Sequence, residues 1–159
     1  MAKVKKTNAM RILDRHGISY NIYTYEKEDG KIDGISVANK IGKDVKFVYK
    51  TLVAQGASTE IYVFVIPVAC ELDLKLAAKA AGEKNIHMIP VKDLNKWTGY
   101  IRGGCSPIGM KKHYKTFIDQ SAEQLEAVVV SAGKIGMQVE LSVKDLQMLT
   151  KAQFCSLIR

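Results

Sequence analysis

The sequence has few cysteines, and no two of them lie close together. Cys70, Cys105 and Cys155 are odd in number and widely separated, and no CxxC pair is present. A disulfide framework would need an even set of cysteines, and a structural zinc site would need closely spaced ligands. We therefore expect three reduced thiols in a cytoplasmic protein that uses no metal ion and no cofactor.

Long apolar segments are also missing. No run approaches the roughly 18 residues that cross a bilayer, and the opening MAKVKKTNAM lacks the apolar core of a signal peptide. The chain also has no internal repeat, low-complexity tract or linker-like segment. These absences favour a soluble protein without a membrane partner, built as one compact unit.

Positive charge, in contrast, is in excess. Lysine and arginine number 24 against 16 acidic residues, so the formal charge is +8 and the pI is near 9.3. This excess fits a polyanionic partner, although a basic solvated surface would look the same. The lysines gather in three groups: Lys3, Lys5 and Lys6; Lys40, Lys43, Lys46 and Lys50; and Lys111, Lys112 and Lys115.

The hydrophobic pattern predicts a mixed α+β domain. With 159 residues, 47% of them hydrophobic, the chain has the size and the core material of a single domain spanning 1–159. Apolar alternation predicts strands, and caps with helical spacing predict helices. We expect one mixed, barrel-like sheet flanked by helices. The predicted strands are 18–26, 46–56, 61–69, 87–90, 115–121, 127–131 and 137–141, and the predicted helices are 7–17, 35–42, 73–82, 91–97 and 142–153.

The segment 98–112, TGYIRGGCSPIGMKK, predicts a shaped loop. It holds four glycines and a proline, too many breakers for a helix and too few alternating apolar residues for a strand. Glycine lets a ligand approach the main chain closely, so the amides of Gly103 and Gly104 could line a small site beside Ser106 and the following lysines. The alternative is a tight surface turn followed by solvated charge. The spacing matches neither GxxxxGK[ST] nor GxGxxG.

The strand around Lys50 raises a second question. In KFVYKTLVAQG, residues 46–56, both faces are largely apolar, so Lys50 is predicted to be buried in a central strand. A buried ammonium is costly unless it is paired or neutralised. Lys50 therefore meets an anion, is held neutral, or lies near the strand end and extends to solvent.

Several segments, read in order, resemble the YbaK/EbsC family of free-standing relatives of the prolyl-tRNA synthetase editing domain. The resemblance covers nearly the whole chain, and GGCSPIGMKK, residues 103–112, is its most specific part. It implies a YbaK-like editing-domain fold. It also implies hydrolysis of mischarged aminoacyl-tRNA, chiefly Cys-tRNA(Pro), with the tRNA acceptor end as partner and prolyl-tRNA synthetase as a candidate partner. The other segments are FVYKTLV, ASTEIYVFVIPV, LDLKLAAKAAG and SAGKIGMQVEL.

The resemblance also assigns roles to residues. Lys50 matches the family's essential lysine and is the expected catalytic residue, which positions the substrate. Gln138 stands where one branch of the family has an aspartate, and a neutral amide cannot supply that charge. The predicted substrate-binding residues are Tyr20, Thr51, Gly103, Gly104, Cys105, Ser106, Ser131 and Gln138.

The implied chemistry needs no protein nucleophile. In the family the substrate's own cysteine thiol attacks its carbonyl, so the glycine amides would stabilise the developing oxyanion. Cys105 is an alternative nucleophile, but no histidine has a recognisable pairing with it, and we expect it to line the pocket. Two other functions stay open: a non-catalytic module that binds a tRNA end or another polyanion, and a Schiff-base enzyme that uses Lys50.

Overall fold

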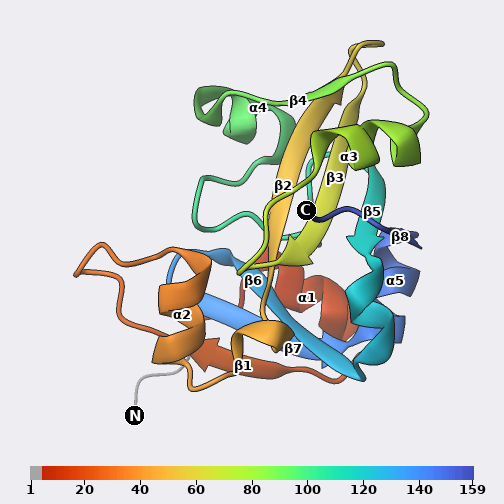
Figure 1. Cartoon of the computed structure of the whole chain (residues 1–159). Helices are drawn as coiled ribbons and strands as arrows, with labels where there is room; N and C mark the ends of the chain where they lie inside the picture. The colour runs from red at the N-terminus through yellow and green to blue at the C-terminus, as the bar shows by residue number, and fades with distance from the viewer. Residues whose placement is uncertain (1–4) are drawn as a thin grey trace.

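The computed structural model describes residues 5–159, and it places two β-sheets among five α-helices (Figure 1). Lys3 of the first lysine group lies outside the described residues. The α-helices are α1 (Asn8–Arg15), α2 (Gly34–Lys40), α3 (Leu74–Ala81), α4 (Leu94–Thr98) and α5 (Val143–Thr150). The strands are β1 (Asn21–Thr24), β2 (Tyr49–Gly56), β3 (Ile61–Pro67), β4 (Ile86–Met88), β5 (Lys115–Asp119), β6 (Ala127–Lys134), β7 (Met137–Ser142) and β8 (Gln153–Cys155). Short 3-10 helices cover Val45–Phe47, Val91–Asp93 and Gln120–Gln124.

The larger sheet has the order β4-β2-β3-β5-β8 and the smaller one the order β1-β7-β6. β2 and β3 form an antiparallel hairpin, whereas β3 with β5 and β5 with β8 run parallel. A single bridge between Val48 and Val129 joins the two sheets. The predicted mixed α/β class is therefore confirmed, with two adjoining open sheets where the sequence predicted one barrel-like sheet.

The core occupies both faces of the larger sheet. One face packs against α1, α5 and the smaller sheet, and the other packs against α3. Every residue of β3 is buried, which explains its continuous apolar sequence. Phe64 of β3 stacks on Phe117 of β5 with ring centroids 5.5 Å apart. This central hairpin is the rigid element from which the site is built.

Helix ends follow their capping residues. Thr7 accepts a hydrogen bond from the Met10 amide at the start of α1, and Ser142 accepts one from the Asp145 amide at the start of α5, as predicted. Gly82 ends α3 in the left-handed conformation. Within residues 5–159 no helix combines the length and the apolar character needed to cross a membrane.

Several element boundaries differ from the prediction, and one strand was not predicted. The strand predicted over 18–26 shortens to β1, the one predicted over 115–121 ends at Asp119, and the helix predicted over 142–153 ends at Thr150. The strand predicted from 46 begins at Tyr49, because Asp44 caps a 3-10 helix just before it. β6 continues to Lys134 through a register shift after Ser131, so the turn before β7 is only two residues long. β8 was not predicted. It has three residues and a polar first position, and its pairing with β5 comes from distant parts of the chain.

Candidate active site

A cavity of about 900 Å³ lies beside β2 and is lined by residues of α2 and α4. Six parts of the chain line it: the end of the 26–33 loop with α2, strand β2 with Val48, Val68 after β3, the segment from Met88 to Leu94, the glycine loop (residues 98–112) and the β6–β7 hairpin. The larger sheet supplies its rigid side, and the other elements complete it.

Most of the predicted site residues line this cavity. Tyr20 does not, because its hydroxyl donates a 3.0 Å hydrogen bond to Asp14 on α1. Ser106 is fully buried, and its hydroxyl accepts a hydrogen bond from the Ile108 amide at 3.2 Å, so it shapes the loop. Gly104 packs against the hairpin instead of the cavity. The predicted residues that line the cavity are Lys50, Thr51, Gly103, Cys105, Ser131 and Gln138.

Lys50 is a half-buried cation on the β2 wall of the cavity. Within residues 5–159 it forms no salt bridge. The other charged residues in the lining are Asp33 and Arg102. Asp33 caps α2 by accepting hydrogen bonds from the amide and hydroxyl of Ser36, so its carboxylate is already engaged. The positive charge of the cavity is therefore available to an anionic ligand.

The open edge of β2 adds main-chain groups to the same wall. β4 pairs with β2 only from Ala54 to Gly56, and the last contact is a 3.3 Å hydrogen bond from the Ile89 amide to the Val53 carbonyl. Main-chain groups alternate between the two edges of a strand, so those of Thr51 lie on the same edge as those of Val53 and face the cavity. The Thr51 hydroxyl is buried and has no partner among the described residues. A bound ligand could satisfy these groups.

The glycine loop presents unused amides. Gly103 has φ +87°, and a Cβ there would lie 2.8 Å from the Cδ1 atom of Ile32. The Gly104 amide donates to the Ile101 carbonyl at 3.0 Å, so the expectation that it faces an oxyanion is not met. Within residues 5–159 the amides of Gly103 and Cys105 have no hydrogen-bond partner, and both residues line the cavity. Both amides are free donors on residues of the cavity wall, and among the described residues the Arg102 amide beside them is free as well.

Cys105 is unsuited to be a nucleophile. It is only 9% exposed, and burial raises the pKa of its thiol to about 12. None of the three histidines lines the cavity, so no imidazole is placed to take its proton. The thiol stays protonated near neutral pH, and the thiol form is a poor nucleophile.

Known proteins share sequence features with this chain. The sequence pattern of the aminoacyl-tRNA editing domain matches residues 33–149. The chain belongs to the aminoacyl-tRNA editing domain family. Over 160 aligned residues the chain is 46% identical to a protein of Enterococcus faecalis named "Putative Cys-tRNA(Pro)/Cys-tRNA(Cys) deacylase EbsC", covering 99% of this chain and 98% of that protein. The predicted family is therefore confirmed.

Solved structures show the same fold at lower identity. One, described as "a putative trans-editing enzyme for prolyl tRNA synthetase", has a TM-score of 0.84 at 21% identity, covering 98% of this chain and 99% of that one. A second, of a hypothetical protein, has a TM-score of 0.85 at 19% identity, covering 94% and 98%. The whole of this editing domain thus has the architecture of known structures.

Sequence reasoning missed the outer wall of the editing domain's cavity. Gly30, Ile32 and Asp33 line it from a loop that looked merely polar. The one available signal was Ile32, a single apolar residue in EKEDGKIDG, residues 26–34. Arg102 was also missed, since it is one of many exposed cations in the sequence.

Within residues 5–159 no group of three or more His, Cys, Asp or Glu side chains could hold a metal ion.

The lysines after the glycine loop lie elsewhere in the editing domain. Lys112 and His113 line a second cavity of about 450 Å³, together with His16 and Lys151. The positive charge predicted beside the glycine amides is thus supplied by Lys50 and Arg102 instead.

Proposed function

We propose that the protein is an aminoacyl-tRNA deacylase that removes cysteine from mischarged tRNA, chiefly Cys-tRNA(Pro), in the cavity beside β2. The observation that supports this function is the meeting of an unpaired cation, Lys50, with two free amides of the glycine loop in one cavity. Membership of the editing family and the name of the Enterococcus faecalis relative agree with this substrate class.

In the proposed mechanism each group has one task. Lys50 holds a phosphate or the ribose end of the terminal nucleotide, which is polyanionic and complementary to an ammonium. The amides of Gly103 and Cys105 donate to the oxygen that gains charge as the ester carbonyl is attacked. The substrate's own thiol sulfur forms the new bond to that carbonyl carbon. The bond to the ribose oxygen then breaks, and the thiol proton ends on the ribose hydroxyl. The cyclic thioester that leaves is opened by one water molecule to give free cysteine.

Radiolabelled cysteine released from Cys-tRNA(Pro) tests this function. We expect the wild-type protein to accelerate release, and Lys50→Ala to lower kcat/KM by about a hundredfold because one charged contact is lost. Cys105→Ala is the comparison variant: it removes the buried thiol, which has no chemical task, but keeps the Cys105 amide that donates to the oxyanion, so activity should stay within about threefold of wild type. Circular dichroism would establish that both variants are folded. A folded wild-type protein without turnover would refute the proposal.

A non-catalytic tRNA-binding module is the second candidate, favoured by the net charge of +8. It predicts binding of tRNA that weakens steeply with salt and no ester cleavage.

Prolyl-tRNA synthetase is proposed as a recruiting partner, and adding it to the release assay should lower the KM for tRNA. A role in translation would place the protein in the cytoplasm.

A further inference from the structure

The outer wall of the cavity is a loop, residues 26–33, that leans on the glycine loop. The Cδ1 atom of Ile32 lies 2.8 Å from the point where a Cβ on Gly103 would be, so the two residues are in direct contact. Gly103 also offers one of the free amides. The position of Ile32 therefore sets how much room there is beside that amide, where the acyl group of the proposed substrate would lie.

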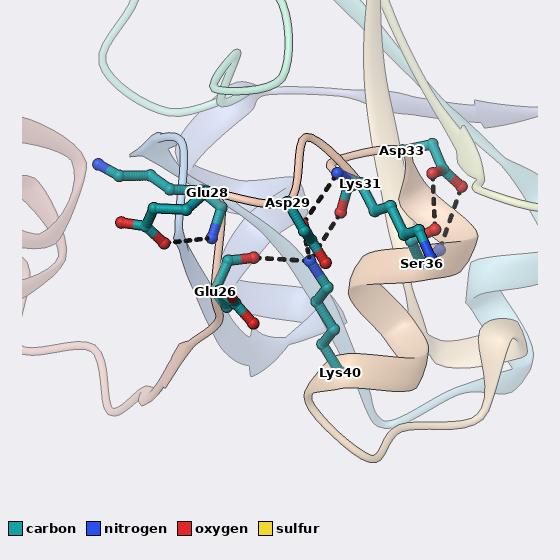
Figure 2. Close-up of polar contacts among 8 residues, drawn as sticks. Glu26, Glu28, Asp29, Lys31, Asp33, Ser36 and Lys40 are labelled. Carbon is teal, nitrogen blue, oxygen red and sulfur yellow. Dashed lines mark hydrogen bonds and ion pairs between the residues drawn. The ribbon is translucent and has the colours of Figure 1, made fainter.

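One ammonium group holds this loop in place. Lys40, at the end of α2, donates to the Glu26 carbonyl at 2.6 Å, to Asp29 Oδ1 at 2.8 Å and to the Lys31 carbonyl at 3.0 Å (Figure 2). An ammonium has three donors, so all of them are spent on a segment of six residues. The third bond fixes the residue directly before Ile32.

The contacts around Lys40 are partly shielded from water. The side chains of Lys40 and Asp29 are 20% and 33% exposed, whereas fully exposed pairs contribute little. The hydrogen bond from Lys40 holds the pKa of Asp29 below its usual value, so this carboxylate stays charged near neutral pH. The ammonium also lies 6.0 Å from the centre of the Tyr25 ring. Without Lys40, the loop keeps its internal hydrogen bonds, such as that from the Ile32 amide to the Gly30 carbonyl at 3.1 Å, but loses the three bonds that tie it to α2.

We propose that Lys40 is a positioning residue that sets the amino-acid selectivity of the deacylase by holding Ile32 against Gly103. The proposal rests on the proposed function and adds to it the determinant of acyl size. Lys40 does not line the cavity itself, so it acts through the loop. Loss of the three bonds lets Ile32 move away from Gly103 and opens the acyl end to larger side chains.

Lys40→Met tests this, because methionine keeps a long unbranched stem and removes every donor. We would measure kcat and KM for one tRNA charged with cysteine and with homocysteine, which keeps the attacking thiol and is one methylene longer. The ratio of kcat/KM for homocysteine to that for cysteine should rise by about tenfold in this variant, as one freed apolar contact allows. On the cysteine ester, KM should rise more than kcat falls, because the reacting groups are untouched.

Lys43→Met is the matched control. Lys43 pairs with Glu140 at 2.8 Å, its side chain is 28% exposed, and it touches neither the loop nor the cavity. Its loss should leave the homocysteine to cysteine ratio unchanged even if the protein is less stable. If Lys40→Met fails to fold, Asp29→Ala removes one of the three acceptors and should move the ratio in the same direction.

Three results would overturn the assignment: equal losses on both esters in Lys40→Met, the same ratio change in Lys43→Met, or no change at all. If the wild-type protein cleaves neither ester, the proposed function fails separately. The positioning role is then decided by calorimetry with cysteine and homocysteine joined by an amide to 3′-amino-3′-deoxyadenosine. Lys40→Met should still favour the homocysteine compound about tenfold more than the wild type does. An unchanged preference, or no binding of either compound, would overturn it.

Discussion

Two residues of the same cavity differ in how deeply they are buried. Lys50 is half-buried on a strand edge and lines the cavity, whereas Cys105, within the glycine loop, is only 9% exposed. Tyr100 helps to fix that loop, since its hydroxyl donates a hydrogen bond to the Ile108 carbonyl. Burial raises the pKa of the Tyr100 hydroxyl to about 12, so it stays protonated and remains a donor. A cation and a neutral thiol can thus lie in one small site without forming an ion pair.

The burial of Cys105 predicts its reactivity. A thiol with a pKa of about 12 has on the order of one thiolate in ten thousand molecules at pH 8, and only the thiolate reacts. Iodoacetamide should therefore label Cys70, which is partly exposed, at least about tenfold faster than Cys105. Peptide mass spectrometry at timed intervals measures both rates. In denaturant the two rates should converge, and equal rates in the folded protein would contradict the assignment.

At the scale of elements, the β6–β7 hairpin depends on close contact with the glycine loop. β6 shifts register between Ser131 and Lys134, and Gly133 lies in this irregular stretch with φ +96°. A Cβ on Gly133 would lie 2.9 Å from the Tyr100 ring. The Ser131 hydroxyl accepts a hydrogen bond from the Gly133 amide at 3.1 Å, which fixes this cavity residue in the bulge. Loop and hairpin therefore form one unit behind the site.

Gly133→Ala should disturb this unit. The positive φ costs about 1 kcal/mol for any side chain, and the contact with the Tyr100 ring should bring the loss of unfolding free energy to about 3 kcal/mol. Gly17→Ala is the control, because Gly17 also has a positive φ of +65° but no atom lies within 4 Å of the added Cβ. That variant should lose only about 1 kcal/mol in urea unfolding. Similar losses in both variants would show that the ring contact is unimportant.

The sequence predicted the elements better than the contacts between them. Helices with clear caps, such as those after Thr7 and Ser142, lie where expected, because capping is a local interaction. The bulge after Ser131 escaped prediction, since a bulge depends on the partner strand. β8 escaped for a similar reason, because its partner β5 lies far away in sequence.

Among the site residues, too, those with a local sequence signal were predicted and those that depend on distant contacts were not. Local motifs indicated Lys50 and the glycine loop, and the structure places both on the cavity. Tyr20 shares the strand pattern but pairs with Asp14, and no local feature announced that partner. The Lys40 contacts join residues 9 to 14 positions apart through a loop without periodicity. Only the folded structure shows that the polar loop, residues 26–33, lines the cavity.

At the scale of the whole molecule, one buried carboxylate ties the smaller sheet to the α2 side. Glu140 of β7 accepts hydrogen bonds from Asn21 at 3.1 Å and from the Tyr23 hydroxyl at 3.2 Å, and it pairs with Lys43 at 2.8 Å. Its side chain is 15% exposed. By contrast, Glu71 pairs with Arg159 near the chain end, and both side chains are about two-thirds exposed or more, at 71% and 66%. The two pairs should contribute very differently to folding.

Acid titration separates their contributions. Burial pushes the pKa of Glu140 upward, but hydrogen bonds from Lys43, Asn21 and Tyr23 outweigh it and hold the pKa below 4.5. A lowered folded pKa means that the carboxylate stabilises the protein above its unfolded value, and that this contribution is lost as pH falls through the folded value. Glu140→Gln should therefore cost about 1 to 2 kcal/mol at pH 7, and the difference from wild type should shrink between about pH 4.5 and pH 3.

Urea unfolding at pH 7, 5, 4 and 3 measures this difference, with Glu71→Gln as the matched control. The Arg159 guanidinium also holds the pKa of Glu71 below its usual value, but water screens this exposed pair. The urea midpoint of that variant should match that of wild type at every pH. A Glu140→Gln difference that does not change with pH would mean that shape and packing, and not the charge of Glu140, hold the smaller sheet against the α2 side. The acid sensitivity of the fold would then have to arise from other carboxylates.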